Sequence, residues 1–111
     1  MKLVFVFLLI CNLTWSQNKD SVYTDINEAL LEPLKVRSLQ IVNQDLKVMP
    51  VEVATLKNIR ELIIINSPTL NFEEALRYFS TCNNLVSLYL DDNKLIALPN
   101  SLTQLKSLKP P

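Results

Sequence analysis

The chain has 111 residues, of which 49% are hydrophobic, and its 11 basic and 11 acidic side chains give a formal net charge of zero. This length allows one small folded domain, and the balanced charge excludes a strongly basic nucleic-acid-binding protein. His and Gly are both absent, which removes the commonest acid–base and metal-binding side chain and makes a Gly-rich phosphate loop impossible. Backbone positions with positive φ must then be filled by Asn or Asp.

The first sixteen residues have the features of a secretory signal peptide. Lys2 precedes an unbroken apolar run over residues 3–11, and Ser16 is a small residue placed like a cleavage site. A membrane anchor is disfavoured, because the run is far shorter than the ~20 residues that span a bilayer. We predict cleavage of residues 1–16, a mature chain that begins at Gln17 without a membrane span, and a secreted, periplasmic or cell-surface location. Lipidation at Cys11 and retention of the segment stay as alternatives.

Residues 17–35 are predicted to form an N-terminal capping segment with a helix over 24–32. The sequence "DINEAL" in this segment matches "NFEEAL" 46 residues further on, which is two periods of the 23-residue repeat described below. Pro33 is expected to end this helix.

Three units with the same order of apolar residues follow, over residues 36–58, 59–84 and 85–107, and residues 108–111 open a fourth. Their starts lie 23, 26 and 23 residues apart. Eight positions recur between the first and third units, namely Val36, Leu39, Ile41, Leu46, Met49, Pro50, Val53 and Leu56, which match Leu85, Leu88, Leu90, Leu95, Leu98, Pro99, Leu102 and Leu105. A fixed period in this range indicates a solenoid.

The second unit is longer because it contains a helix, predicted over residues 71–82. Asn71 is the expected N-cap, and Glu74 three residues later completes a capping box. The apolar residues of this stretch share one helical face: Phe72, Ala75, Leu76, Phe79 and Cys82.

Each unit reads L-x-x-L-x-L-x-x-N-x-L-x-x-L-P-x-x-L-x-x-L, which resembles the leucine-rich repeat in its 23-residue form, over residues 24–108. The resemblance implies an α/β solenoid with a short parallel sheet on its concave face, helical or irregular convex segments, about three repeats and an N-terminal cap helix. It also implies that Asn93 hydrogen-bonds the backbone of neighbouring turns. The counterparts of Asn93 are Gln44 and Ser67, so this polar ladder is expected to be imperfect.

Alternation of period two assigns the two faces of each predicted strand. Leu88 and Leu90 are expected to point into the core, and the residues between them outward. The outward positions include four apolar residues on strands ~4.8 Å apart, which are Val42, Ile63, Ile65 and Tyr89. Because solvated positions usually hold polar residues, we predict that this face binds a protein or peptide. The alternative is that β-branched residues are favoured in strands whether or not the face binds anything. The candidate binding residues are Gln40, Val42, Glu61, Ile63, Ile65, Ser87, Tyr89 and Asp91.

The remaining reactive side chains favour no chemistry. The run Asp91 to Asn93 could hold calcium, but further acidic ligands are missing. Cys82 could be a nucleophile, but no His can activate it and its apolar helical face indicates packing; after cleavage it would have no disulfide partner. We predict no enzyme activity, no metal and no cofactor.

The third unit is followed by no recognisable cap. Lys109, Pro110 and Pro111 cannot form the strand that Leu108 would open, whereas terminal repeats normally carry a polar cap. The alternative function is therefore a truncated fragment, or the capping end, of a longer leucine-rich-repeat protein, with no partner of its own.

Overall fold

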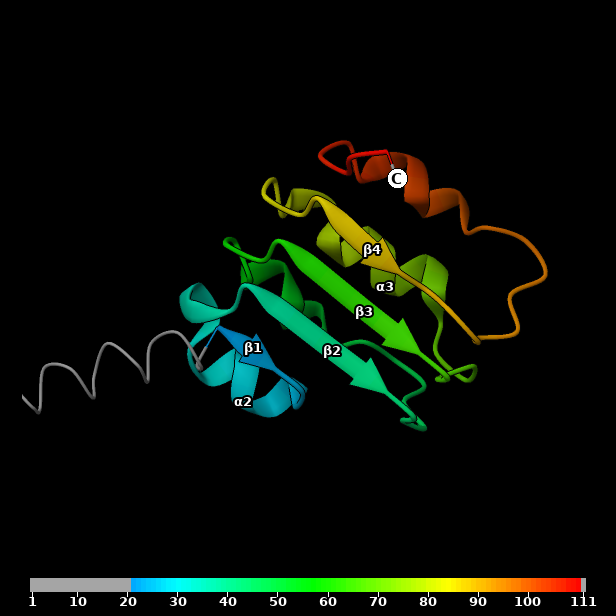
Figure 1. Ribbon diagram of the computed structural model, residues 1–111, viewed down its shortest axis with the longest axis horizontal. Helices are drawn as coiled ribbons and strands as arrows, with labels where there is room; N and C mark the ends of the chain where they lie inside the picture. Colours follow the sequence, from blue (N-terminus) through cyan, green and yellow to red (C-terminus); the bar gives the residue numbers. More distant parts are fainter. Residues whose placement is uncertain (1–20, 111) are drawn as a thin grey trace, which may run out of the picture.

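The computed structural model describes residues 21–110 and contains a four-stranded parallel sheet (Figure 1). Its strands follow chain order, β1-β2-β3-β4, so every connection returns the chain to the next position in the same sheet. Their bounds are β1 Val22–Tyr23, β2 Ser38–Val42, β3 Glu61–Ile65 and β4 Ser87–Tyr89. The fold is a short α/β solenoid of about four repeats, because β1 adds one strand to the three that were predicted. The proposed signal peptide lies outside the described residues.

The return path of each repeat is helical. The α-helices are α2 (Ile26–Leu31) and α3 (Phe72–Tyr78), and the 3₁₀ helices are η1 (Pro33–Lys35), η2 (Val51–Thr55), η3 (Phe79–Thr81) and η4 (Asn100–Gln104). The two 23-residue repeats thus return through a 3₁₀ helix alone, and the three additional residues of the second repeat accommodate α3.

Both α-helices are shorter than predicted. The Asp25 carboxylate accepts hydrogen bonds from the backbone N–H groups of Asn27 and Glu28, at 2.7 and 3.2 Å, so α2 begins only after Asp25. At the end of α3, the Phe79 N–H bonds to the Leu76 carbonyl three residues back, and the chain tightens into η3. The predicted N-cap is confirmed, since the Asn71 side chain accepts from the Glu74 N–H at 3.2 Å.

Strand register places the outward residues in rows across the sheet. Ser38, Glu61 and Ser87 are partners in one row, and Gln40, Ile63 and Tyr89 form the next row. This is the predicted arrangement of rows. The alternation of inward and outward side chains along these short strands was enough to predict it.

One predicted column member lies beyond its strand. β4 ends at Tyr89, so Asp91 belongs to the turn that follows. Its carbonyl still accepts from the Asn66 N–H at 3.2 Å, as the Ile65 carbonyl accepts from the Asn43 N–H at 3.0 Å. Asp91 therefore stays beside the end of β3 without being part of the sheet.

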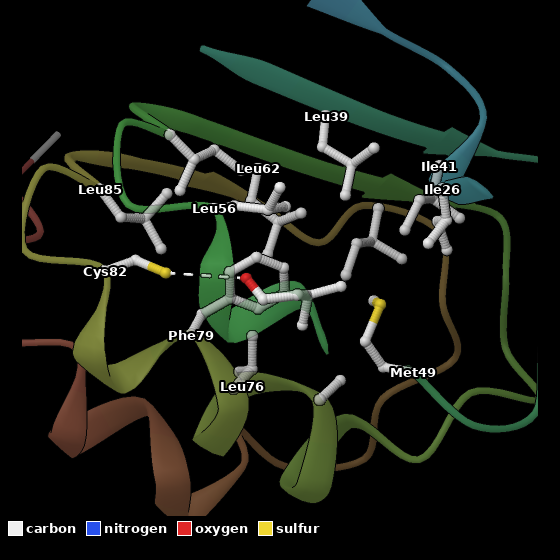
Figure 2. Packing of buried hydrophobic residues seen from close by; sticks show 14 of the residues in the cluster. Ile26, Leu39, Ile41, Met49, Leu56, Leu62, Leu76, Phe79, Cys82 and Leu85 are labelled. Atoms are coloured by element: carbon white, nitrogen blue, oxygen red, sulfur yellow. Dashed lines mark hydrogen bonds between the residues drawn. The ribbon is translucent and has the colours of Figure 1, made fainter. Parts of the chain in front are cut away.

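One hydrophobic core fills the space between the sheet and the helical segments (Figure 2). The strands contribute Leu39, Ile41, Leu62 and Ile64, and the return path contributes Met49, Val53, Leu56, Leu76 and Phe79. Cys82 is part of this core as predicted, with Sγ 3.9 Å from the Val53 carbonyl oxygen. Burial raises the pKa of the Cys82 thiol.

Leu88 and Leu90 were predicted to be core residues, but both are only half-buried. They pack against the core from its last turn, where no further strand lies beside β4 in the described part of the chain. Both side chains point to the core side as predicted. They are not fully buried because alternation defines the face of a side chain, whereas full burial also requires a neighbour on each side.

Positive φ angles occur after the strands. Because the chain has no Gly, other residues fill these positions. Asn43 (57°), Asn66 (49°) and Asp92 (58°) hold equivalent positions in successive repeats, and these residue types tolerate this conformation best among non-Gly residues. Lys94 (56°) is an exception that the sequence did not predict.

Candidate binding surface

The outward face of β2, β3 and β4 carries an apolar centre, which we call the sheet face. It comprises the predicted binding residues Gln40, Val42, Glu61, Ile63, Ile65, Ser87 and Tyr89, with Asp91 in the adjoining turn. Tyr89 and Val42 are 47% and 42% exposed, and Ile63 and Ile65 are half-buried. Side chains on directly opposite positions of neighbouring strands touch, so the structure brings the predicted residues together.

Register defines two apolar rows on the sheet face. Ile63 lies between Gln40 and Tyr89, and Val42 is opposite Ile65. Ile63 and Ile65 follow each other on the same side of β3, and join the two rows into a single patch.

Acidic groups flank this patch at both ends of the strands. Glu61 is half-buried at the start of β3 and its Oε1 accepts a 2.8 Å hydrogen bond from the Ser38 hydroxyl. Asp91 is exposed in the turn after β4. The sheet face thus offers apolar contact area in its centre and negative charge at its two margins.

The same fold occurs in a solved leucine-rich-repeat protein from Leptospira interrogans. The two structures match with a TM-score of 0.66 and 31% sequence identity, over 78% of this chain and 21% of that chain. This chain is a leucine-rich-repeat protein. It spans about a fifth of the length of the Leptospira protein. No family model matches the chain, and no curated protein matches it.

Family membership carries a general functional meaning. The leucine-rich-repeat fold is typically non-enzymatic, and membership implies a protein-interaction module. Within residues 21–110, no three His, Cys, Asp or Glu side chains are grouped so that they could hold a metal ion. In the same range, no helix is long and apolar enough to cross a membrane.

The polar ladder of this leucine-rich-repeat protein is continuous, although its residues differ from turn to turn. The buried Asn93 accepts from the Ser67 N–H at 2.7 Å and donates to the Ile64 carbonyl at 2.6 Å. The Ser67 hydroxyl in turn accepts from the Gln44 N–H at 3.2 Å and donates to the Ile65 carbonyl at 3.2 Å. The ladder is imperfect as expected in one respect, because the Ser67 hydroxyl donates within its own turn, whereas the Asn93 amide donates to the neighbouring turn. These bonds hold the carboxyl ends of the strands beneath the sheet face.

Glu73 has a structural role that the sequence did not suggest. Its carboxylate oxygens accept from the backbone N–H groups of Asn100 and Ser101, the second at 3.1 Å, and thereby cap η4. The residue before η4 is Pro99, which makes no side-chain capping bond of its own. The sequence gives no sign of this role, since Glu73 and the residue that it caps are 27 positions apart and no local pattern links them.

Proposed function

We propose that this leucine-rich-repeat protein is an exported interaction module that binds a protein or peptide partner through its sheet face. The observation that carries the proposal is the position of Tyr89 beside Ile63 at the centre of that face. Tyr is enriched among the residues that dominate interface energies, because it combines a large apolar area with a polar tip.

The margins of the sheet face indicate which kind of partner fits best. A ligand side chain placed over Ile63 would be apolar, and groups placed towards Glu61 and Asp91 would be basic. Opposite charges at an interface speed association and fix the orientation of the partner. We therefore propose a partner segment with an apolar anchor flanked by Lys or Arg.

The competing explanation is that β-branched residues occupy β3 only because they suit a strand. This accounts for Ile63 and Ile65 individually. Strand propensity also covers Val42 and Tyr89 individually, but it does not explain why these exposed side chains lie beside Ile63 and Ile65. Four apolar residues from three strands in one patch favour a contact surface.

Photo-crosslinking tests the proposal before the partner is known. A photoreactive phenylalanine analogue at position 89 reports on the sheet face, and the same analogue at Arg77, which is exposed on α3, is the matched control. We expect a discrete crosslinked product from position 89 when the protein is exposed to its native extracellular surroundings, and none from position 77. Equal crosslinking at both positions, or at 77 alone, would contradict the choice of face.

Export is a separate part of the proposal and rests on residues 1–16. Intact mass of the protein recovered outside its producing cell should correspond to a chain that begins at Gln17, with the further loss of ammonia if the N-terminal Gln has cyclised. Recovery of a chain that keeps Met1 would contradict cleavage and leave the binding proposal intact.

A further inference from the structure

A pocket of about 450 Å³ lies where β1 and β2 end, beside the start of α2, and we call it the rim pocket. Its volume is in the range of sites that hold small ligands or single side chains. The sheet-face residues do not line it. Its polar lining consists of Thr24, Asp25, Asn27 and Gln44.

Two successive turns of the chain form the rim pocket and fix its walls. The Gln44 side-chain amide, after β2, donates to the Thr24 carbonyl, after β1, at 3.3 Å. The Gln44 N–H is held in turn by the Ser67 hydroxyl at 3.2 Å. The chain enters β1 from Ser21, at the opposite end of that strand from the rim pocket. The rim pocket is therefore a feature of the repeat stack between β1 and β2.

The rim pocket adjoins the sheet face. Tyr23 pairs with Leu39 in the parallel register of β1 and β2, so Thr24, the next residue, lies beside Gln40 of the sheet face. Gln40, Ile63 and Tyr89 form one row across the following strands. A ligand that lies across this row towards β1 would reach the rim pocket.

Asp25 supplies the charge of the rim pocket, and is the one charged residue among the described residues that line it. Its Oδ1 accepts from the backbone N–H groups of Asn27 and Glu28, at 2.7 and 3.2 Å, which holds the carboxylate in place. Within residues 21–110, its second oxygen, Oδ2, accepts no hydrogen bond. One oxygen of a positioned carboxylate is therefore available to a ligand.

Neutral acceptors accompany this carboxylate. The Gln44 amide nitrogen is used by the Thr24 carbonyl, and within the described part of the chain no donor bonds the Gln44 Oε1. The Asn27 side-chain oxygen and the Thr24 hydroxyl are further acceptors in the lining. The polar side of the rim pocket thus favours a cation that carries several N–H donors.

The remaining lining is apolar and fits an aliphatic stem. Val48 is 58% exposed, Leu46 and Pro50 are half-buried, and Ile26 belongs to the core. Lys and Arg side chains cover apolar surface with their methylene groups while the charged head stays in polar surroundings. An apolar wall beside one carboxylate matches this division.

Other classes of ligand match the lining less well. An anion would be repelled by Asp25. Calcium takes six to eight oxygen ligands, usually with several carboxylates, and within residues 21–110 no three His, Cys, Asp or Glu side chains are grouped so that they could hold a metal ion. Between the two basic side chains, Arg suits acceptors from several residues better, because its planar head carries five donors whereas Lys is a point charge.

We propose that the rim pocket binds an Arg side chain of the polypeptide that occupies the sheet face. The inference rests on the proposed function for the source of that side chain and adds a second anchor to it. Thr24 and Ile63 are two strand spacings apart, or about 10 Å. About three residues of extended chain cover this distance, so the partner carries an Arg about three positions from its apolar anchor.

The probe is acetyl-arginine methylamide, added to the full chain and followed by the shifts of backbone amide signals in NMR spectra. Acetyl-citrulline methylamide has the same shape without the charge and is the ligand control. Asp25→Asn removes the charge of the rim pocket and keeps an oxygen that can cap α2. Asp45→Asn is its matched control, at an exposed carboxylate that does not line the pocket.

A second pair of variants tests the position independently of the cap. Val48→Lys places an ammonium group at the rim pocket, where it would compete with the probe. Val51→Lys makes the same change at a residue outside the lining, and the parent side chains are similarly exposed, at 58% and 56%.

We expect saturable shifts at the amides of Asn27, Glu28 and Gln44 with the arginine probe and none with the citrulline probe. The dissociation constant should rise at least about fivefold in Asp25→Asn and Val48→Lys, because the charge-assisted hydrogen bonds are lost or blocked. Both control variants should stay within about twofold of the parent. Parent-like binding by Asp25→Asn, or equal binding of the two probes, would overturn the proposal.

The sheet-face proposal can fail separately from this one. Ile63→Ala and Tyr89→Ala should bind the arginine probe like the parent, since neither residue lines the rim pocket. If crosslinking at position 89 captures no partner while the probe still binds with the expected specificity, the sheet-face proposal is contradicted and the cation site stands. If a captured partner binds Asp25→Asn as tightly as the parent, the second anchor is contradicted and the sheet face stands.

Discussion

Asn93 is the residue whose side chain links two turns of this leucine-rich-repeat protein through buried hydrogen bonds. Replacing it by Ala would leave the Ser67 N–H and the Ile64 carbonyl without a partner. Each buried backbone group left unpaired costs roughly 1–3 kcal/mol. We expect Asn93→Ala to lower the free energy of unfolding by roughly 2–5 kcal/mol, measured by urea denaturation.

Asn84→Ala is the control for this substitution. The Asn84 amide also bonds a backbone carbonyl, that of Lys57 at 3.1 Å, but in an exposed position where water can replace it. Its cost should stay below about 1 kcal/mol. Equal losses for the two variants would contradict a specific role of the polar ladder.

The Cys82 thiol gives the stability of the protein a dependence on pH. Because burial raises the pKa of Cys82, the folded chain keeps the thiol protonated at pH values where the unfolded chain has begun to release the proton. The stabilisation is complete below the unfolded pKa of about 8.5 and is lost as pH rises through the folded pKa. We expect unfolding free energy to fall between pH 7 and pH 10 by more in the parent than in Cys82→Ala. A parallel decline in both proteins would contradict this assignment.

Single residues also mark the limits of prediction from sequence. The lack of Gly indicated that Asn and Asp would fill the left-handed positions, and Asn43, Asn66 and Asp92 do so. The same reasoning did not identify Lys94, because no residue preference points to Lys there. The bond from the Gln44 N–H to the Ser67 hydroxyl was not predicted for a related reason: a Ser at a position usually held by Asn has no distinctive spacing.

At the scale of elements, the strands were predictable because each has one buried face. The alternation in "RELIIIN" and "VSLYL" cannot shift by one residue without exposing the core side chains, and the observed register follows from it. β1 was not predicted, since two residues are too few to show a period. The ends of α2 and α3 depend on individual hydrogen bonds at their caps, which a periodic pattern does not specify.

Burial differs between β3 and the last turn, and stability should follow this difference. Ile64 is fully buried, so Ile64→Ala should cost roughly 2–5 kcal/mol through lost transfer energy and a cavity. Leu90 is half-buried at the edge, so Leu90→Ala should cost clearly less, roughly 1–2 kcal/mol. Urea midpoints with unchanged m values provide the comparison. A larger loss for Leu90→Ala than for Ile64→Ala would mean that the last turn is covered in solution.

Glu73 connects α3 with η4 and is therefore unsuitable as a control residue on the convex side. Because its carboxylate caps η4, charge reversal there would disturb the return path of the third repeat as well as the surface. Arg77 is exposed on α3, and within residues 21–110 its side chain makes no hydrogen bond to another repeat, so it is the better reporter of that side. Substitution at Arg77 alters charge and leaves the repeat interface in place.

At the scale of the whole molecule, the sheet face differs from the core positions in what constrains its side chains. The sheet face arises from outward positions that no packing requirement constrains, and its apolar centre is therefore informative about binding. Leu88 and Leu90 are half-buried core positions of the last turn, where no further strand lies beside β4 among the described residues.

The affinity of the partner captured by crosslinking, measured for a matched set of variants, tests the sheet-face assignment most directly. Tyr89→Ala and Ile63→Ala should each weaken binding by more than about 1 kcal/mol, roughly fivefold or more, if they are the anchors of the interface. Arg77→Glu should bind like the parent. In all three variants, the unfolding midpoint should fall no further than truncation of a half-exposed side chain would cause. Parent-like binding by Tyr89→Ala and Ile63→Ala, together with loss of binding in Arg77→Glu, would place the interface on the convex side and contradict the account.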